Sequence, residues 1–261
     1  MSPVRASLRT SGRRDGAADA IPWRGNRRPG DGATIIGAPH TAPPAHAREG
    51  IIAADKSSSW AHCEDFRQLD DVMLRAMDRA DELGCGSVST GTGALLQVLA
   101  AGKRASAVVE IGTGAGVSGL WLLRGMAPDG VLTTIDTEAE HHRAAKSAFA
   151  EEGVRATRTR TITGRALDVL PRLTDAAYDL VLADSDPLEL PAQLDQAIRL
   201  LRPGGLLVVA HVLHDDRVPD PARRDEVTTA LREAGRTVRD DDRLVPAMVG
   251  VGDGLLVAAR R

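Results

Sequence analysis

The sequence predicts an α/β domain in which a mainly parallel sheet is covered by helices on both faces. From residue 107 onward, short apolar runs alternate with helical patterns, which is typical of βαβ units. The runs are apolar throughout, as in strands that are buried on both sides. The last two predicted strands are separated only by Gly252-Asp253, and a link this short permits only an antiparallel pair.

The N-terminal part of the chain has a different composition. Proline and glycine recur over residues 28–32 and 42–45, and no apolar stretch there keeps a helical or strand period. Such a segment cannot bury enough surface to offset its ordering entropy. We therefore expect a disordered N-terminal extension over residues 1–58 and a single domain over residues 59–261, which is long enough for one well-buried core.

The elements of the domain follow from the spacing of apolar residues. Two helices, over 64–83 and 94–101, precede the first strand, and Gly84 and Gly86 end the first of them. The predicted strands are 107–111, 131–135, 159–163, 178–183, 206–210, 244–251 and 254–259. The predicted helices between them are 117–126, 138–152, 166–173, 190–201 and 222–234.

Charge and cysteine content exclude several classes of partner. The net charge of −3 offers no basic surface for nucleic acid or a membrane, and no apolar run reaches transmembrane length. The two cysteines, Cys63 and Cys85, lack the spacing of metal ligands. We therefore expect no nucleic-acid or membrane partner, and a reducing cytoplasm as the compartment.

The strongest chemical signal is a glycine-rich turn between a strand and a helix, within residues 108–119. Gly114-x-Gly116-x-x-Gly119 matches the dinucleotide fingerprint, but such a match alone is weak evidence. Glu110, two residues before Gly112, would place a carboxylate where a pyrophosphate would bind. Because like charges repel while a sulfonium or ammonium is attracted, the pattern favours S-adenosylmethionine over NAD.

Two further segments follow strands that end at the same edge. Asp136 ends the second strand, about 20 residues beyond the glycine turn, where an acid accepts hydrogen bonds from ribose hydroxyls. The alternative is that Asp136 only caps the helix that starts near Glu138. The segment Gly164–Asp168 is either an adenine-binding turn or an ordinary strand-to-helix connection.

With these residues in place, the chain resembles the bacterial O-methyltransferases related to catechol and caffeoyl-CoA O-methyltransferases, over about residues 60–261. The shared segments are 86–89, the glycine turn, Ile135-Asp136, 178–186 and 200–205. The resemblance implies a Rossmann-like sheet of seven strands in the order 3-2-1-4-5-7-6, with strand 7 antiparallel. It also implies a homodimer.

The resemblance further implies a set of site residues. Asp184, at the end of the fourth strand, would face the acceptor substrate. The cofactor pocket would be lined by Val88, Glu110, Gly112, Thr113, Ser118, Asp136, Thr137 and Asp186.

The family pattern breaks where its metal-dependent members hold a divalent cation. Those members use an Asp after strand 4, an Asp-Asn pair after strand 5 and a nearby lysine. Here Asp184 is kept, but the lysine position is Pro187 and the pair is Ala210-His211. One carboxylate cannot hold Mg²⁺. Three alternatives stay open: a softer metal on Asp184, His211 and His214; His211 as a metal-free general base; or a structural His211 with Asp184 orienting the substrate.

These observations predict an enzyme that transfers a methyl group from S-adenosylmethionine to a hydroxyl of a small-molecule acceptor. The alternative is a catalytically weak or inactive S-adenosylmethionine-binding protein. A nicotinamide dehydrogenase is disfavoured by Glu110 and by the lack of a Tyr-x-x-x-Lys pair. Aromatic residues are few, with Trp121 expected in the core and Trp60 over the pocket mouth, so the acceptor need not be a catechol.

Overall fold

The computed structural model describes residues 56–261, and residues 1–55 lie outside the described part. The expected N-terminal extension, residues 1–58, therefore falls almost wholly outside it. Its last three residues belong to helix α1 (Lys56–Glu64), so the first helix starts before the expected domain boundary. No helix in the described range is long and apolar enough to cross a membrane.

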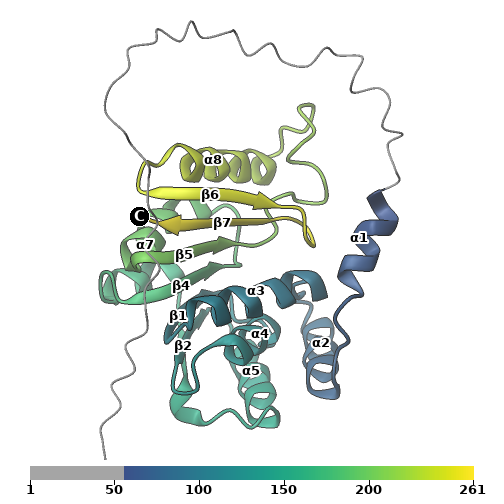
Figure 1. Cartoon of the computed structure of the whole chain (residues 1–261), viewed down its shortest axis with the longest axis vertical. Helices are drawn as coiled ribbons and strands as arrows, with labels where there is room; N and C mark the ends of the chain where they lie inside the picture. The colour runs from purple at the N-terminus through teal and green to yellow at the C-terminus, as the bar shows by residue number, and fades with distance from the viewer. Residues whose placement is uncertain (1–55) are drawn as a thin grey trace, which may run out of the picture. The chain divides into compact units, whose positions relative to one another are not determined.

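Seven strands form one sheet in the order β3-β2-β1-β4-β5-β7-β6 (Figure 1). Strand β7 runs antiparallel to both of its neighbours, β5 and β6, and the other pairs are parallel. The predicted strand order is thereby confirmed. The bounds are β1 Ala107–Ile111, β2 Val131–Asp136, β3 Thr159–Thr163, β4 Tyr178–Ala183, β5 Leu201–Val209, β6 Leu244–Val249 and β7 Leu255–Arg260.

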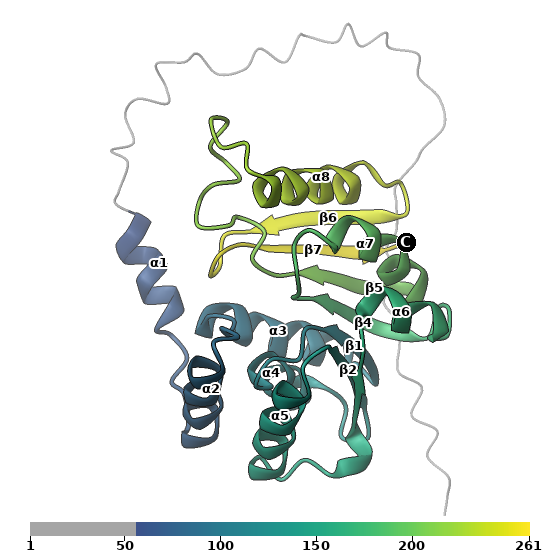
Figure 2. The ribbon, with the colours of Figure 1, turned by 180° about the vertical axis from the view of Figure 1, so that it is seen from behind.

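Helices cover both faces of the sheet (Figures 1 and 2). One set comprises α2 (Asp71–Leu83), α3 (Thr90–Lys103), α4 (Val117–Gly125) and α5 (Ala139–Glu151), and the other comprises α6 (Ala166–Val169), α7 (Leu190–Leu200) and α8 (Glu226–Asp240). Successive strand residues point to opposite faces. Val108 accordingly belongs to the core under the first set and Val109 to the core under the second.

The structure differs from the predicted elements most clearly at three places. The helix expected over 64–83 corresponds to α2 alone, which begins only at Asp71 because Asp70 caps it by accepting a hydrogen bond from the Met73 amide at 3.0 Å. Helix α1, which ends at Glu64, is not among the predicted elements. The helix expected to start at residue 222 starts at Glu226, capped by Asp225. Strand β5 starts at Leu201, and its pairing with β4 shifts register between Tyr178 and Leu180.

The carboxyl ends of β1, β2, β4 and β5 meet at one edge of the sheet. The strand order reverses between β1 and β4, which is where open α/β sheets bind their ligands. At this point Gly112 has a φ of 96°, and a β-carbon there would overlap the backbone oxygen of Asp184. Only glycine allows the two strand ends to approach this closely.

Candidate functional site

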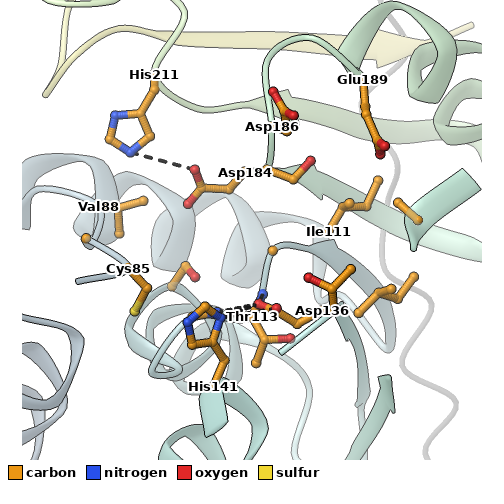
Figure 3. A pocket seen from close by; sticks show the side chains of 18 of the residues that line it. Cys85, Val88, Ile111, Thr113, Asp136, His141, Asp184, Asp186, Glu189 and His211 are labelled. Atoms are coloured by element: carbon orange, nitrogen blue, oxygen red, sulfur yellow. Dashed lines mark hydrogen bonds and ion pairs between the residues drawn. The ribbon is translucent and has the colours of Figure 1, made fainter. Parts of the chain in front are cut away.

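A cavity of about 790 Å³ opens at this edge, within the size range of small-molecule sites (Figure 3). Its walls come from the ends of β1, β2, β3, β4 and β5 and from the segment before α3. Among the predicted site residues, the walls include Val88, Gly112, Thr113, Ser118, Asp136, Thr137, Asp184, Asp186 and His211. Glu110 and the candidate metal ligand His214 are the predicted site residues that are not part of the wall.

Four backbone amides of the glycine turn are bonded within the protein. The amides of Thr113 and Gly114 donate to Oδ2 of Asp136 at 3.0 and 3.1 Å. The Gly116 amide donates to the Thr113 carbonyl at 3.0 Å, and the Gly112 amide to the Ile135 carbonyl at 2.9 Å. A phosphate-binding turn needs such amides free for the anion. These four amides of the turn are therefore not free to bind a pyrophosphate, which disfavours a dinucleotide.

Asp136 is the centre of this arrangement. Besides the two amides of the turn, its carboxylate accepts from the Glu138 amide at 2.9 Å and lies 3.1 Å from Nδ1 of His141. Burial would raise the pKa of Asp136, but the hydrogen bonds from Glu138, Gly114 and His141 hold it below its usual value. An ionised acceptor therefore stands in the cavity wall. Asp136 contacts the start of α5 and the cavity at once, so the two predicted roles are compatible, and its binding of ribose stays a prediction.

Glu110 lies behind the cavity wall and is fully buried. Its Oε2 accepts a hydrogen bond from the Thr134 hydroxyl at 2.6 Å, and the hydroxyls of Thr134 and Thr113 are also 2.6 Å apart. Since Thr134 has one proton and donates it to Glu110, Thr113 is the donor in the second bond. A hydrogen-bonded chain thus links the cavity wall to the buried carboxyl group.

The surroundings of Glu110 raise the pKa of its carboxyl group. Burial raises its pKa to about 7, and the nearby charges of Asp184 and Asp136 add to this, while the hydroxyl groups of Thr134 and Ser118 oppose it. Oε1 of Glu110 has no hydrogen-bond partner among the described residues. A positive charge in the cavity would stabilise the ionised form of this group, which fits a sulfonium or ammonium ligand.

The charges of the cavity wall favour the same kind of ligand. The wall carries the carboxylates of Asp136, Asp184, Asp186 and Glu189. Arg165 is the one arginine or lysine among its described lining residues, and its Nη2 is paired with Oε1 of Glu189 at 2.7 Å. A cavity with this excess of acids attracts a cation and repels a polyphosphate.

Asp184 and His211 face each other at the far side of the cavity (Figure 3). Nε2 of His211 lies 3.7 Å from Oδ1 of Asp184, and Nδ1 of the same ring lies 3.7 Å from Oδ2 of Asp253. Burial raises the pKa of Asp184, and the nearby His211 opposes this shift. The arrangement brings an imidazole, which is suited to proton transfer near neutral pH, to the end of strand β4.

The third residue of the softer-metal alternative lies elsewhere. Nε2 of His214 is 3.9 Å from Oδ1 of Asp225 at the start of α8, and His214 is not among the residues that line the cavity. Within residues 56–261, no group of three or more His, Cys, Asp or Glu side chains is arranged to hold a metal ion. Asp184, His211 and His214 are thus not brought together as a ligand set.

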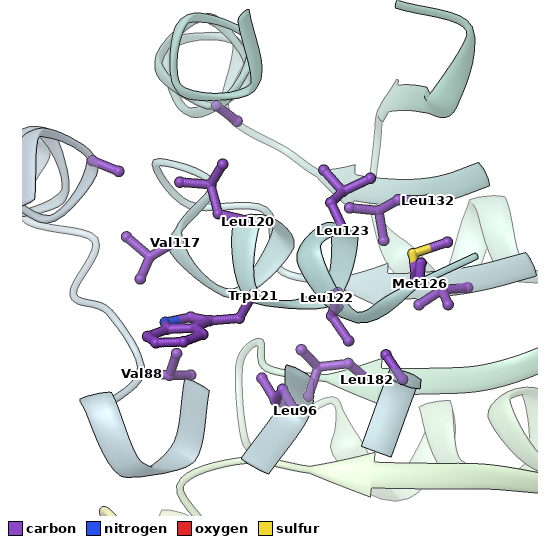
Figure 4. Close-up of a cluster of buried hydrophobic side chains, with 14 of the residues drawn as sticks. Val88, Leu96, Val117, Leu120, Trp121, Leu122, Leu123, Met126, Leu132 and Leu182 are labelled. Carbon is purple, nitrogen blue, oxygen red and sulfur yellow. The ribbon is translucent and has the colours of Figure 1, made fainter. Parts of the chain in front are cut away.

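Several lining residues carry too weak a sequence signal to be predicted. They are Cys85, His141, Ser185, Glu189 and Gln193. His141 and Glu189 reach the cavity because their helices start at the same edge, so proximity to Asp136 and Asp186 along the chain was the available signal. Trp60 is not part of the wall, whereas Trp121 is buried in the core between α3 and α4, as expected (Figure 4).

Comparisons with known proteins agree with this geometry. A family model described as O-methyltransferase matches residues 62–261. A Mycobacterium ulcerans (strain Agy99) protein that carries the O-methyltransferase name is 52% identical over 200 residues, covering 77% of this chain and 89% of that protein.

Solved structures show the same similarity. A Corynebacterium glutamicum protein matches with a TM-score of 0.73 and 36% identity, over 78% of this chain and 96% of that one. The O-methyltransferase TomG of Streptomyces achromogenes, involved in tomaymycin synthesis and solved with S-adenosylmethionine, matches with a TM-score of 0.70 and 30% identity, over 78% and 96% of the two chains.

Proposed function

Because the chain belongs to the O-methyltransferase family and is an S-adenosylmethionine-dependent enzyme, we propose that it methylates a hydroxyl of a small-molecule acceptor without a divalent metal ion. In this proposal His211 is the general base. The observation that carries it is the pair of Asp184 and His211, 3.7 Å apart at the cavity, where metal-dependent relatives would hold their cation.

The cofactor fits the acidic cavity. S-adenosylmethionine supplies an electrophilic methyl group on a sulfonium. The proposed ribose acceptor is Asp136, whose carboxylate is held in place by the amides of the glycine turn. Glu110 supplies a buried negative charge behind Thr113, and Gly164 and Arg165 line the part of the wall expected to meet adenine.

In the proposed reaction, His211 removes the proton of the acceptor hydroxyl. A neutral hydroxyl is a poor nucleophile, so its proton must leave as the new bond forms. The acceptor oxygen forms a bond to the methyl carbon, the carbon–sulfur bond breaks with its electron pair going to sulfur, and the hydroxyl proton goes to Nε2 of His211. Asp184 lies beside that nitrogen and stabilises the imidazolium that results.

A smaller cavity of about 210 Å³ adjoins Asp184 and His211 and supports a small, uncharged acceptor. Its volume is below the ~300 Å³ at which pockets for drug-sized ligands begin. The walls are mainly aliphatic: Ala183, Pro187, Leu190, Val209, Ala210 and Leu231. No Phe, Tyr or Trp lines either cavity within the described residues, so the site lacks the aromatic walls that usually hold planar phenols.

The test uses protein freed of metal with EDTA, labelled S-adenosylmethionine and a panel of phenols and small alcohols. We expect turnover without added metal, and a loss of about 10²- to 10⁴-fold in kcat for His211→Ala. His214→Ala is the matched control, because His214 lies on the same loop but outside the cavity wall. Complete loss of turnover with EDTA that a divalent cation restores would contradict the metal-free mechanism, and an unchanged His211→Ala would contradict the base.

One observation favours a second function. Pro187 and Ala210-His211 replace residues that metal-dependent relatives use for catalysis, while the cofactor residues are kept. A catalytically weak or inactive S-adenosylmethionine-binding protein would show this pattern. Tight binding of S-adenosylhomocysteine with no turnover across the panel would favour that alternative.

The proposal also includes the oligomeric state and the cellular compartment of the protein. The first is a homodimer, which sedimentation would test. The second is a reducing cytoplasm, supported by Cys63 and Cys85, both of which are free thiols.

A further inference from the structure

We propose that Asp253, in the turn between β6 and β7, is a positioning residue that sets the tautomer of His211. The proposal rests on the proposed role of His211 as the base. Asp253 is not among the residues that line either cavity. It therefore acts through His211 and not on the cofactor or the acceptor.

The imidazole of His211 lies between two carboxylates. Nδ1 is 3.7 Å from Oδ2 of Asp253, and Nε2 is 3.7 Å from Oδ1 of Asp184. A neutral imidazole carries its proton on one nitrogen and accepts with the other. The two distances are equal, but burial raises the pKa of Asp184 and so disfavours its ionised form, whereas Oδ1 of Asp253 is anchored by the Asp215 amide at 2.9 Å. With the proton held on Nδ1 by Asp253, Nε2 is left unprotonated on the side of the cavity, which is the state that a base requires.

The backbone of the His211 loop is tied to the same turn. The Leu213 amide donates to the Asp253 carbonyl at 2.9 Å, and the Asp215 amide donates to Oδ1 of Asp253 at 2.9 Å. His211 itself has a φ of 55°, a conformation that residues other than glycine adopt rarely and keep only where their surroundings impose it. Asp253 thus helps to impose the loop conformation with one side-chain oxygen and faces the imidazole with the other.

The turn is also held from its other side, by the N-terminal part of the domain. Oε1 of Glu64 accepts from the Gly252 amide and Oε2 accepts from the Gly91 amide, both at 2.7 Å. One carboxylate therefore joins the end of α1, the start of α3 and the β6–β7 turn. This support restricts the movement of Asp253 relative to the sheet, as the positioning of a base requires.

The substitution Asp253→Asn separates the two roles of the Asp253 side chain, which are to support the loop through the Asp215 amide and to face Nδ1 of His211. The amide oxygen of Asp253→Asn can still accept from the Asp215 amide, so the loop keeps its support. The amide nitrogen then replaces Oδ2 and donates towards Nδ1 of His211. This exchange favours a proton on Nε2, which is the opposite tautomer.

The experiment measures ¹⁵N chemical shifts of the histidine rings in the full-length protein, with His211→Gln used to assign the His211 signal. We expect the Nδ1–H tautomer in wild type and a majority of the Nε2–H tautomer in Asp253→Asn. Asp216→Asn, an exposed aspartate on the same loop, is the matched control and should behave as wild type. S-adenosylhomocysteine should bind all three proteins within twofold, as measured by calorimetry.

An Nε2–H tautomer in the wild type, or the same tautomer in wild type and Asp253→Asn, would overturn the proposal. A His211 signal that shifts on adding micromolar Zn²⁺ or Mn²⁺ would overturn it too, because His211 would then be a metal ligand. These readouts need no acceptor. Failure of the proposed function would instead appear as absent turnover or absent S-adenosylhomocysteine binding.

Discussion

Replacing Glu110 with glutamine removes the ionisable group buried behind the glycine turn while keeping the shape of the side chain. The group is fully buried, and Oε2 accepts from Thr134 at 2.6 Å. Glutamine can accept the same hydrogen bond with its amide oxygen but cannot ionise. The substitution therefore isolates the effect of the charge.

The magnitude follows from the pKa of Glu110. Burial raises this pKa from 4.5 to about 7, and each unit corresponds to about 1.4 kcal/mol. The folded state thus disfavours the ionised form by about 3 kcal/mol. Because the folded pKa lies above the unfolded one, the stabilisation from binding the proton is complete below about pH 4.5 and is lost as the pH rises through about 7.

The assay is urea unfolding of the cofactor-free protein between pH 5 and pH 8. From pH 5 to pH 8, the free energy of unfolding of Glu110→Gln should rise relative to that of wild type by about 2–3 kcal/mol, because a part of the stabilisation is already lost in wild type at pH 5. Other titrating groups contribute to both proteins and cancel in the difference. Glu82→Gln, which changes an exposed glutamate, should show no such rise.

Cofactor binding supplies a second readout of the same charge. A sulfonium in the cavity stabilises ionised Glu110, so the affinity for S-adenosylmethionine should rise through about pH 7 in wild type, by about tenfold for each unit by which binding lowers the pKa of Glu110. Glu110→Gln should lack this dependence. Unfolding curves of wild type and Glu110→Gln that stay parallel from pH 5 to pH 8 would refute the reasoning, because the buried carboxyl would then have an ordinary pKa.

Three further predictions concern the site and its support. Asp136→Ala should weaken S-adenosylhomocysteine binding by about 10- to 100-fold in calorimetry; unchanged affinity would exclude Asp136 as the ribose acceptor. Asp179→Asn should lower the free energy of unfolding at pH 7 by about 1–3 kcal/mol, because Oδ2 of Asp179 accepts from the amides of Ser106 and Ala107 at 2.7 and 3.0 Å. Burial alone would raise the pKa of Asp179, but these bonds keep it below 3.8. The loss of stability caused by Asp179→Asn should therefore shrink as the pH falls below that value. A loss of stability that persists at low pH would contradict the charge-based explanation. Gly93→Ala should cost about 1–3 kcal/mol in urea unfolding, since the new methyl group would overlap the indole of Trp121, and an unchanged midpoint would mean that α3 and α4 can separate freely.

Much of the fold could be predicted because it depends on local patterns. Buried parallel strands are apolar along their whole length, and the spacing of apolar residues is periodic in the helices that cover them. The start of α2 was predicted too early because apolar spacing already begins at Phe66 and Leu69, and only the capping bond of Asp70 marks the actual start. The early start of β5 was missed because Pro203 and glycines interrupt its apolar pattern.

Most of the candidate site could also be predicted, because it lies at strand ends that the sequence identifies. Glu110 was predicted to line the cofactor pocket but lies behind the cavity wall. The side chain of a strand residue points to one face of the sheet or the other, and the sequence could not show which face the Glu110 carboxyl group would occupy. His141 and Glu189 reach the cavity only through the direction in which their helices start. The only sequence signal for these two residues was their proximity along the chain to Asp136 and Asp186.

The sequence by itself determined the class of fold, the glycine turn and the acids at the strand ends, because each depends on residues that are close along the chain. Its resemblance to the family showed the loss of the usual metal-ligand pattern at Pro187 and Ala210-His211. Tertiary structure decided what those residues do to one another. In the folded protein, amides of the glycine turn donate hydrogen bonds to Asp136, and burial raises the pKa of Glu110. Asp253, in a turn that is distant along the chain, lies beside His211. Contacts between distant segments depend on how the sheet and its helices pack, and no local pattern encodes them.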